Sequence, residues 1–277
     1  MILVTGATGN IGSALLRELC LSGAAPVRGL TRAVGRVSFP EGVEAVEGDL
    51  AQAESLKAAL EGVRSLFLWV GTGAEGEVIA AARQAGVEHV VLVSSITVQT
   101  HPHLPGAGEN LAVEQLLKNS GMAWTILRPT QFASNTLWWA QSIRDQGVVR
   151  APYADIGLPA IHPADIAAVA RVALTDPGHR GRTYALTGPE CVTARQQVAA
   201  IAAVLGREVA FIEISREEAH QQMASFMGDE TAGAVLDLMG GDVNDELVRV
   251  RDTVSRVTGS EPRSFQEWAS DNGAAFG

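Results

Sequence analysis

The sequence predicts a doubly wound α/β fold, with a parallel sheet covered by helices on both faces and a smaller C-terminal lobe. In the first half of the chain, short apolar runs alternate with helical patterns, as in successive βαβ units. The apolar runs are continuous, which is typical of strands buried on both faces. A glycine-rich segment joins the first strand to the first helix, as in folds of this class.

The elements of the first half follow in order from these patterns. Leu15, Leu16 and Leu19 share one face of the first helix, and Gly86 stops the third helix. Arg128-Pro129 closes the strand that ends at residue 127. The expected strands span 2–4, 26–31, 43–47, 65–70, 89–93 and 124–127, and the expected helices span 11–22, 53–60, 77–85 and 109–119.

The second half is less regular. Its clearest element is the amphipathic helix 163–174, and Thr193 is a plausible N-cap for a later helix. The regular alternation of strand and helix patterns ends near Arg150, which suggests two parts, 1–150 and 151–277, with a single continuous domain as the alternative. Strands are expected at 183–186 and 209–214, and helices at 193–205, 217–227 and 231–239.

Composition excludes several classes of protein. With 277 residues, 47% apolar and 19% charged, the chain can bury a sizeable core. Its net charge of −10 argues against a nucleic-acid partner, whose phosphates need a basic face. No apolar run approaches the roughly 18 residues of a membrane span, and no signal peptide precedes Ile2. Cys20 and Cys191 cannot build a disulfide framework or a zinc site, so a reducing cytoplasm is the expected compartment.

The strongest motif is the segment TGATGNIG at residues 5–12. Gly6, Gly9 and Gly12 give the spacing G-x-x-G-x-x-G between a strand and a helix. The first glycine permits the turn, the second lets a pyrophosphate approach, and the third allows close packing of helix and strand. We therefore expect residues 6 and 8–12 to bind a dinucleotide, and a tight turn without a ligand is the alternative; the intervening binding residues are Thr8, Asn10 and Ile11.

The end of the second strand indicates which dinucleotide is preferred. A carboxylate here would bind the ribose 2′-hydroxyl of NADH, but the strand ends in Thr31-Arg32. The guanidinium of Arg32, assisted by Arg36, suits the 2′-phosphate of NADPH. A solvated loop arginine is the alternative. Asp49 and Leu50, after the third strand, are expected beside the adenine.

The sequence resembles the NmrA-like branch of the atypical short-chain dehydrogenase/reductases, and within that branch it is similar to the type 2 NAD(P)H:quinone oxidoreductases. The resemblance spans nearly the whole chain in order. It is carried by TGATGNIG (5–12), LTR (30–32), GDL (48–50), VSS (93–95), ENLAVEQLLKNSGMAWTILRP (109–129), IHPADIA (161–167), LTGPE (186–190) and TGSEPRSFQEW (258–268).

The resemblance implies a Rossmann core at 1–150 that binds NAD(P) and a substrate lobe at 151–277. It also implies that bound NADPH extends from the glycine segment past Asp49, with its nicotinamide near Pro129 and Phe132. Ser94-Ser95 and Pro129 also have a plain structural interpretation, as the ends of strands. The further cofactor-binding residues implied are Gly71, Thr72, Ser94, Ser95 and Asn110.

One departure from the wider family affects the chemistry. Ordinary carbonyl reductases of this kind use a Tyr-x-x-x-Lys pair, in which tyrosine delivers a proton. Here Gly106 and Asn110 align with those positions, and neither Tyr153 nor Tyr184 has a lysine four residues later. A quinone accepts hydride without a protein acid, because water can protonate the hydroquinone anion. The missing pair therefore favours a quinone-like acceptor or no reaction.

The residues after position 129 suggest an aromatic acceptor. Phe132, Trp138 and Trp139 follow the sixth strand, and flat substrates stack on such side chains, although core packing is the alternative. His101 and His103 are candidate proton donors in a loop after the fifth strand, where exposed histidines are also common. No metal site is expected.

The sequence thus favours an NADPH-dependent oxidoreductase that reduces a quinone or an electron-poor polycyclic aromatic small molecule. A narrower version is a natural-product tailoring reductase or oxygenase, as in antibiotic biosynthesis. The alternative from another class is a non-catalytic NAD(P)-binding redox sensor. Oligomeric state is left open.

Overall fold

A computed structural model of the chain describes residues 1–23, 25–69 and 71–277. These residues group into two compact units, each built from three segments of the chain. This division differs from the predicted boundary near residue 150, because it places residues 130–150 in the second unit and residues 163–186 in the first. Residues 163–186 belong to the first unit because they supply a helix and the last strand of its sheet. The first unit comprises Met1–Pro129, Pro163–Leu186 and Thr253–Ser260, and the second comprises Thr130–His162, Thr187–Asp252 and Glu261–Gly277.

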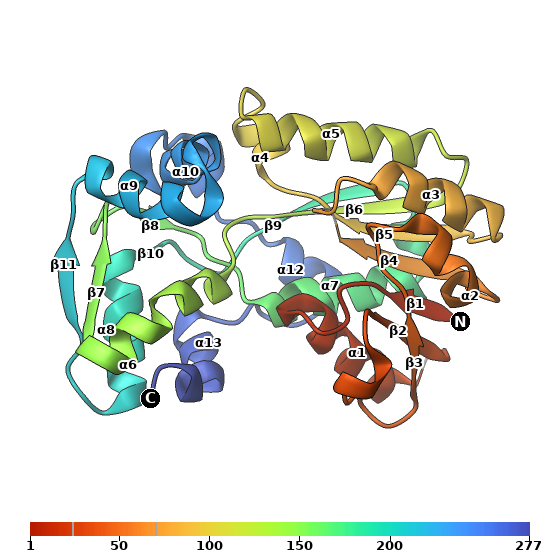
Figure 1. Ribbon diagram of the computed structural model, residues 1–277, viewed down its shortest axis with the longest axis horizontal. Helices are drawn as coiled ribbons and strands as arrows, with labels where there is room; N and C mark the ends of the chain where they lie inside the picture. The colour runs from red at the N-terminus through yellow and green to blue at the C-terminus, as the bar shows by residue number, and fades with distance from the viewer. Residues whose placement is uncertain (24, 70) are drawn as a thin grey trace. The chain divides into compact units, whose positions relative to one another are not determined.

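The first unit contains a seven-stranded sheet with the order β3-β2-β1-β4-β5-β6-β9 (Figure 1). Every neighbouring pair is parallel, so the predicted doubly wound α/β fold is confirmed. The strand order reverses between β1 and β4, and ligands of such folds bind where this reversal occurs. The strands are β1 (Ile2–Val4), β2 (Val27–Thr31), β3 (Val43–Glu47), β4 (Ser65–Trp69), β5 (His89–Val93), β6 (Ala123–Pro129) and β9 (Arg182–Leu186).

Helices cover both faces of this sheet. Helices α1 (Asn10–Ser22) and α7 (Pro163–Thr175) pack together on one face, and α3 (Glu75–Gln84) and α5 (Pro105–Lys118) cover the other (Figure 1). The central strands are therefore buried on both sides, as their unbroken apolar sequence predicts. The shorter helices of this unit are η1 (Val34–Arg36), η2 (Ala53–Leu56), α2 (Lys57–Leu60), α4 (Thr97–Thr100), η4 (Pro177–His179) and α12 (Thr253–Thr258).

Some predicted boundaries need correction. Helix α5 begins at Pro105 rather than at residue 109, because proline suits the first helical position, where no N–H is needed. Gly106 therefore lies within this helix. Helix α3 likewise begins at Glu75, two residues earlier than expected. The expected strand 65–70 ends at Val70, which lies outside the described residues.

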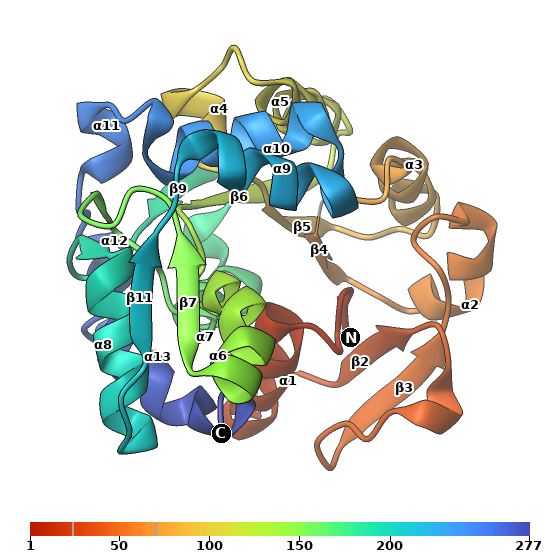
Figure 2. The ribbon, with the colours of Figure 1, turned by 60° about the vertical axis from the view of Figure 1, so that its left-hand side comes forward.

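The second unit contains two small sheets. Strand β7 (Val148–Ala151) pairs in parallel with β11 (Ala210–Glu213), and the two lie side by side in Figure 2. Strands β8 (Gly157–Leu158) and β10 (Val192–Thr193) form an antiparallel pair. The helices of this unit are η3 (Ala133–Trp139), α6 (Ala140–Gln146), α8 (Ala194–Leu205), α9 (Arg216–Met227), α10 (Asp229–Leu236), the π-helical turn η5 (Asp237–Gly241), α11 (Asp245–Val248), α13 (Phe265–Asn272) and η6 (Gly273–Ala275).

Helix α8 is fixed at its start by the predicted cap. The Thr193 side chain accepts the N–H of Gln196, and the Gln196 side chain accepts the N–H of Thr193 in return. Helix α8 also packs against α13, whose Trp268 is almost fully buried among the aromatic rings of Phe265 and Phe276. These three rings belong to a hydrophobic core cluster of the second unit, and α9 and α10 form another. None of the described helices is long and apolar enough to cross a membrane.

Candidate functional site

The glycine segment forms a tight turn between β1 and α1. Gly6 has a φ of +57°, which favours glycine, and its carbonyl accepts the N–H of Gly9 at 2.9 Å. A Cβ on Gly12 would overlap the Gly6 carbonyl, with 2.7 Å to its carbon atom. Gly9 is the N-cap of α1 and has no side chain to bond the first-turn N–H groups. This turn therefore fits the phosphates of a dinucleotide.

A cleft of about 740 Å³ opens beside this turn in the first unit, and we call it the dinucleotide cleft. It brings together residues from the glycine turn and from the ends of β2, β3 and β4. Of the predicted cofactor residues, it is lined by Gly6, Thr8, Thr31, Arg32, Arg36, Asp49, Leu50 and Thr72. It is also lined by Leu30, Ala33, Val37, Gly48 and Trp69, which the sequence analysis did not select.

The charge of the cleft suits a phosphate group. Arg32 and Arg36 line it, and neither forms an ion pair within the described part of the chain. Asp49 is the one carboxylate among the described lining residues, and its Oδ1 already accepts the N–H of Ala51 at 3.0 Å. Two guanidinium groups are thus available to an anion at the end of β2.

Trp69 is the most prominent residue that the sequence analysis missed. It ends β4, its side chain is 43% exposed, and it lines the dinucleotide cleft. Its indole covers Gly71: a Cβ there would lie 2.8 Å from Cζ3 and 2.9 Å from Cζ2. The apolar pattern predicts that Trp69 is buried in a strand. Gly71, which leaves room for the indole, was the available signal that the Trp69 side chain is not buried in the sheet.

Glu75 organises the loop that follows β4. Its Oε1 accepts the N–H groups of Gly71 and Thr72, both at 2.7 Å, and the Thr72 hydroxyl at 3.2 Å. Burial opposes ionisation of Glu75, but these hydrogen bonds outweigh it and lower the pKa of the carboxyl group. The two backbone amides are therefore committed to Glu75 rather than free for a ligand. The spacing Thr72-x-x-Glu75 resembles a capping box and could have revealed this contact.

Ser94 belongs to a buried polar cluster. Its Oγ donates to Oε1 of Glu114 at 2.7 Å, and Arg128 donates to the same carboxylate at 2.8 and 2.6 Å. Glu114 is fully buried. Burial raises its pKa, but the hydrogen bonds from Arg128 and Ser94 prevail and lower it. The Ser94 hydroxyl therefore helps to hold β5, α5 and β6 together.

The other predicted residues of this region lie in local contacts. The Ser95 Oγ accepts the N–H and hydroxyl of Thr97 at the start of α4, and Asn110 Nδ2 donates to the Gly106 carbonyl at 2.7 Å. Pro129 is buried at the end of β6, and its carbonyl accepts the N–H of Ile96. None of these residues lines the dinucleotide cleft, and neither do Gly9, Asn10, Ile11, Gly12, Gly71 or Ser94.

The two candidate histidines have different surroundings. His101 is fully buried at the end of α4, not exposed in a loop, and its Nδ1 lies 2.8 Å from the Thr100 hydroxyl. His103 is exposed, with its ring centroid 5.8 Å from that of His101. The described residues contain no group of three or more His, Cys, Asp or Glu side chains arranged to hold a metal ion.

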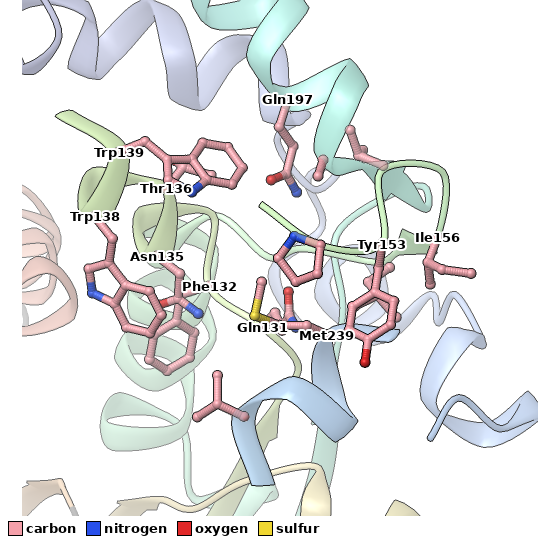
Figure 3. Close-up of a pocket in the computed structure, with 15 residues that line it drawn as sticks. Gln131, Phe132, Asn135, Thr136, Trp138, Trp139, Tyr153, Ile156, Gln197 and Met239 are labelled. Atoms are coloured by element: carbon pink, nitrogen blue, oxygen red, sulfur yellow. The ribbon is translucent and has the colours of Figure 1, made fainter. Parts of the chain in front are cut away.

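The second unit has a pocket of its own, with a cavity of about 80 Å³, which we call the aromatic pocket (Figure 3). It brings together Phe132, Trp138 and Trp139, the three residues predicted to contact an aromatic acceptor. Trp138 is 58% exposed, whereas Trp139 also packs against the core of this unit. The remaining lining residues are Gln131, Asn135, Thr136, Pro152, Tyr153, Ile156, Leu158, Val192, Ala194, Gln197, Val235 and Met239.

Tyr153 holds one wall of the aromatic pocket. Its φ of +56° is the one positive value of a non-glycine residue in the described chain. Its hydroxyl accepts a hydrogen bond from Arg216 at 3.0 Å, and Arg216 also pairs with Asp237 at 2.8 Å. The ring lies so close to Gly240 that a Cβ there would be 2.8 Å from the Tyr153 Cδ2. These contacts fix η5 against the pocket.

Comparison with known proteins places these two sites in context. Residues 6–177 match the model of a family described as NAD(P)H-binding. Over 285 residues the chain is 39% identical to a (4-alkanoyl-5-oxo-2,5-dihydrofuran-3-yl)methyl phosphate reductase of Streptomyces griseus, covering 100% of this chain and 99% of that protein. Over 288 residues it is 38% identical to an NAD(P)H azoreductase of Xenophilus azovorans, with the same coverage.

A solved structure gives a similar result. The NADPH-dependent quinone oxidoreductase of Escherichia coli, in complex with NADPH, matches with a TM-score of 0.81 and 26% identity. The match covers 98% of this chain and 99% of that one. All three proteins are reductases or oxidoreductases, and two of them are named for NAD(P)H or NADPH.

Proposed function

The chain belongs to the NAD(P)H-binding family, among the NmrA-like atypical short-chain dehydrogenase/reductases, and we propose that it transfers hydride from NADPH to a quinone or a similarly electron-poor aromatic acceptor. The observation that carries this proposal is the dinucleotide cleft, which is lined by the glycine turn before α1 and by two arginines that form no ion pair with any described residue. Its relatives are reductases of conjugated acceptors, which supports an enzyme rather than a redox sensor.

The cofactor is held by residues of the first unit. The first-turn N–H groups of α1 bind the pyrophosphate, and Arg32 and Arg36 bind the 2′-phosphate that distinguishes NADPH from NADH. Asp49 and Leu50, which line the cleft, would bind beside the adenine. The nicotinamide would supply the hydride, and the resemblance to the family assigns it to the region of Pro129.

The acceptor is bound in the aromatic pocket. Pro129 ends β6, and three residues later in the sequence Phe132 lines that pocket. Phe132, Trp138 and Trp139 stack on a flat acceptor and orient it. With no Tyr-x-x-x-Lys pair, the reduced acceptor takes its proton from water, and His103, which is exposed, is a better candidate to assist than the fully buried His101.

The acceptors named for the relatives are of the same chemical class as the proposed electron-poor acceptor. A furanone with an alkanoyl substituent, an azo compound and a quinone each contain a conjugated, electron-poor double bond, as the names of those proteins indicate. A polycyclic quinone from a natural-product pathway fits the same description. Its reduced form reacts with oxygen, so the enzyme could act as a tailoring reductase or oxygenase.

Turnover measurements test this proposal. Oxidation of NADPH and of NADH is followed at the nicotinamide absorbance band with simple quinones, polycyclic quinones and an azo dye, while dissolved oxygen is recorded. Quinone-dependent oxidation that prefers NADPH supports a reductase, and oxygen uptake with a hydroxylated product supports the tailoring role. Tight NADPH binding without any turnover would contradict the proposal and favour a sensor.

A further inference from the structure

We propose that the aromatic pocket selects an uncharged acceptor, whose oxygen atoms are bound by the carboxamides of Asn135 and Gln197, and that it rejects acceptors carrying a phosphate or sulfonate. This inference rests on the proposed function, since it specifies the substrate class of the same site. It separates this chain from its relative in Streptomyces griseus, whose name specifies a phosphate ester.

The lining of the pocket has no formal charge. Aromatic, aliphatic and carboxamide side chains surround it, and none of its described lining residues is an Arg, Lys, His, Asp or Glu. An anion placed there would lose its hydration without gaining a partner, which is unfavourable. In the dinucleotide cleft, by contrast, two arginines line the site.

Two arginines beside the lining of the pocket are already in ion pairs, one next to Ala194 in the sequence and one hydrogen-bonded to Tyr153. Arg216 pairs with Asp237 and donates to the Tyr153 hydroxyl. Arg195 pairs with Asp155 at 3.1 Å and lies over the ring of Phe211. A phosphate in the pocket would have to break an existing ion pair to use either of these two arginines.

Two of the three carboxamides of the pocket are available to a ligand. Gln131 donates from Nε2 to the Leu238 carbonyl at 3.2 Å, which fixes its orientation. The half-buried side chains of Asn135 and Gln197 have no hydrogen-bond partner within the described part of the chain. Half-buried polar groups left without partners are suited to a ligand that completes them.

The two side chains reach the pocket from different elements. Asn135 comes from η3, next to Phe132 and Trp138, whereas Gln197 extends from α8 beside Trp139 (Figure 3). A carboxamide both donates and accepts hydrogen bonds. It can therefore donate to a quinone carbonyl before hydride transfer and accept from the hydroquinone hydroxyl afterwards. This change of role suits a neutral acceptor with oxygen atoms on its ring.

The test compares 1,4-naphthoquinone with its 2-sulfonate as acceptors for NADPH. The sulfonate withdraws electrons and is intrinsically the easier to reduce, so a preference for the neutral quinone must come from the pocket. We expect kcat/KM to be at least about tenfold higher for the neutral compound, the effect of roughly one unfavourable polar contact. Equal values, or a preference for the sulfonate, would overturn the inference.

Variants assign the effect to the carboxamides. Gln197→Leu and Asn135→Leu should each raise the KM for 1,4-naphthoquinone by about tenfold, with the NADPH dissociation constant unchanged. Gln197→Arg should reverse the preference and raise kcat/KM for the sulfonate. The matched control is Gln222→Leu, an exposed glutamine on α9 outside the pocket, which should change neither value.

The outcomes separate the two proposals. If the wild-type protein reduces neither compound, the proposed function fails. If it reduces both equally well, or if Gln197→Arg leaves the preference unchanged, the function stands and this inference alone is wrong.

Discussion

Gly12 lies directly against the carbonyl group of Gly6, so closely that a Cβ on Gly12 would be 2.7 Å from the carbonyl carbon. This contact packs the first turn of α1 onto the end of β1. The uncapped first-turn N–H groups of the helix thus follow the glycine turn, of which Gly6 and Thr8 line the dinucleotide cleft. The cofactor site thus depends on the absence of one side chain.

Replacing Gly12 tests this dependence. In Gly12→Ala the new methyl group meets backbone atoms of Gly6 and Ala7, which cannot move as a flexible side chain would. We expect the free energy of unfolding to fall by about 1–3 kcal/mol and the NADPH dissociation constant to rise by at least about tenfold. Urea unfolding and fluorescence titration measure the two effects. Gly108→Ala is the control, because a Cβ there meets nothing within 4 Å.

Arg32 should determine the preference for NADPH over NADH. Removing its guanidinium in Arg32→Ala deletes a charge-assisted hydrogen bond to the 2′-phosphate, so the KM for NADPH should rise by about ten- to a hundredfold. The KM for NADH should not change, because NADH lacks that phosphate. Steady-state kinetics with both cofactors measure this difference. Arg83→Ala on the exposed face of α3 is the matched control. An equal loss for both cofactors would refute the assignment.

Trp69 should contribute an aromatic wall to the dinucleotide cleft. Its exposed indole lies among the residues expected around the adenine, and stacking on a base contributes about 1–3 kcal/mol. We expect Trp69→Leu to weaken NADPH binding by about tenfold, and Trp69→Phe to retain most of the affinity. Equilibrium titration measures both variants. If the leucine and phenylalanine variants bind equally well, the ring does not stack on the cofactor.

His89 should make the fold sensitive to acid. Burial, with a smaller effect of Arg180, lowers the pKa of His89 to about 4 from its usual 6.5. The unfolded chain therefore takes up a proton before the folded chain does. The neutral, buried His89 therefore contributes its full stabilisation to the folded state above pH 6.5, and this contribution is lost as the pH falls towards 4. Urea unfolding across this range should show a steeper loss for the wild type than for His89→Gln. Identical slopes would contradict this account.

The sequence predicted those parts of the fold that depend on interactions between residues close together in the chain. The sheet could be predicted because apolar runs such as 89–93 can only be buried, and the cap at Thr193 because its bonds involve neighbouring residues. Arg32 and Asp49 were selected for a similar local reason, since Arg32 directly follows a predicted strand and Asp49 lies two residues after one. These residues lie in the dinucleotide cleft.

Contacts between distant segments were not predictable in this way. Ser94 is predicted to bind the cofactor, and the local pattern gives no sign that its hydroxyl donates to Glu114, twenty residues later. Gln197 gave no signal in the sequence, because its place in the aromatic pocket depends on how α8 packs within the second unit. The early start of α5 was missed because a segment rich in Pro and Gly resembles a loop. In each case the deciding contact lies outside the local pattern.

The central claim is that the chain transfers hydride from NADPH to a quinone, and its most direct test is an anaerobic reaction with 1,4-naphthoquinone. The NADPH lost and the hydroquinone formed are measured together, without oxygen to recycle the product. We predict that both amounts are equal and that Arg32→Ala slows the reaction at low NADPH. Bound NADPH that survives with the quinone for many hours would contradict the claim.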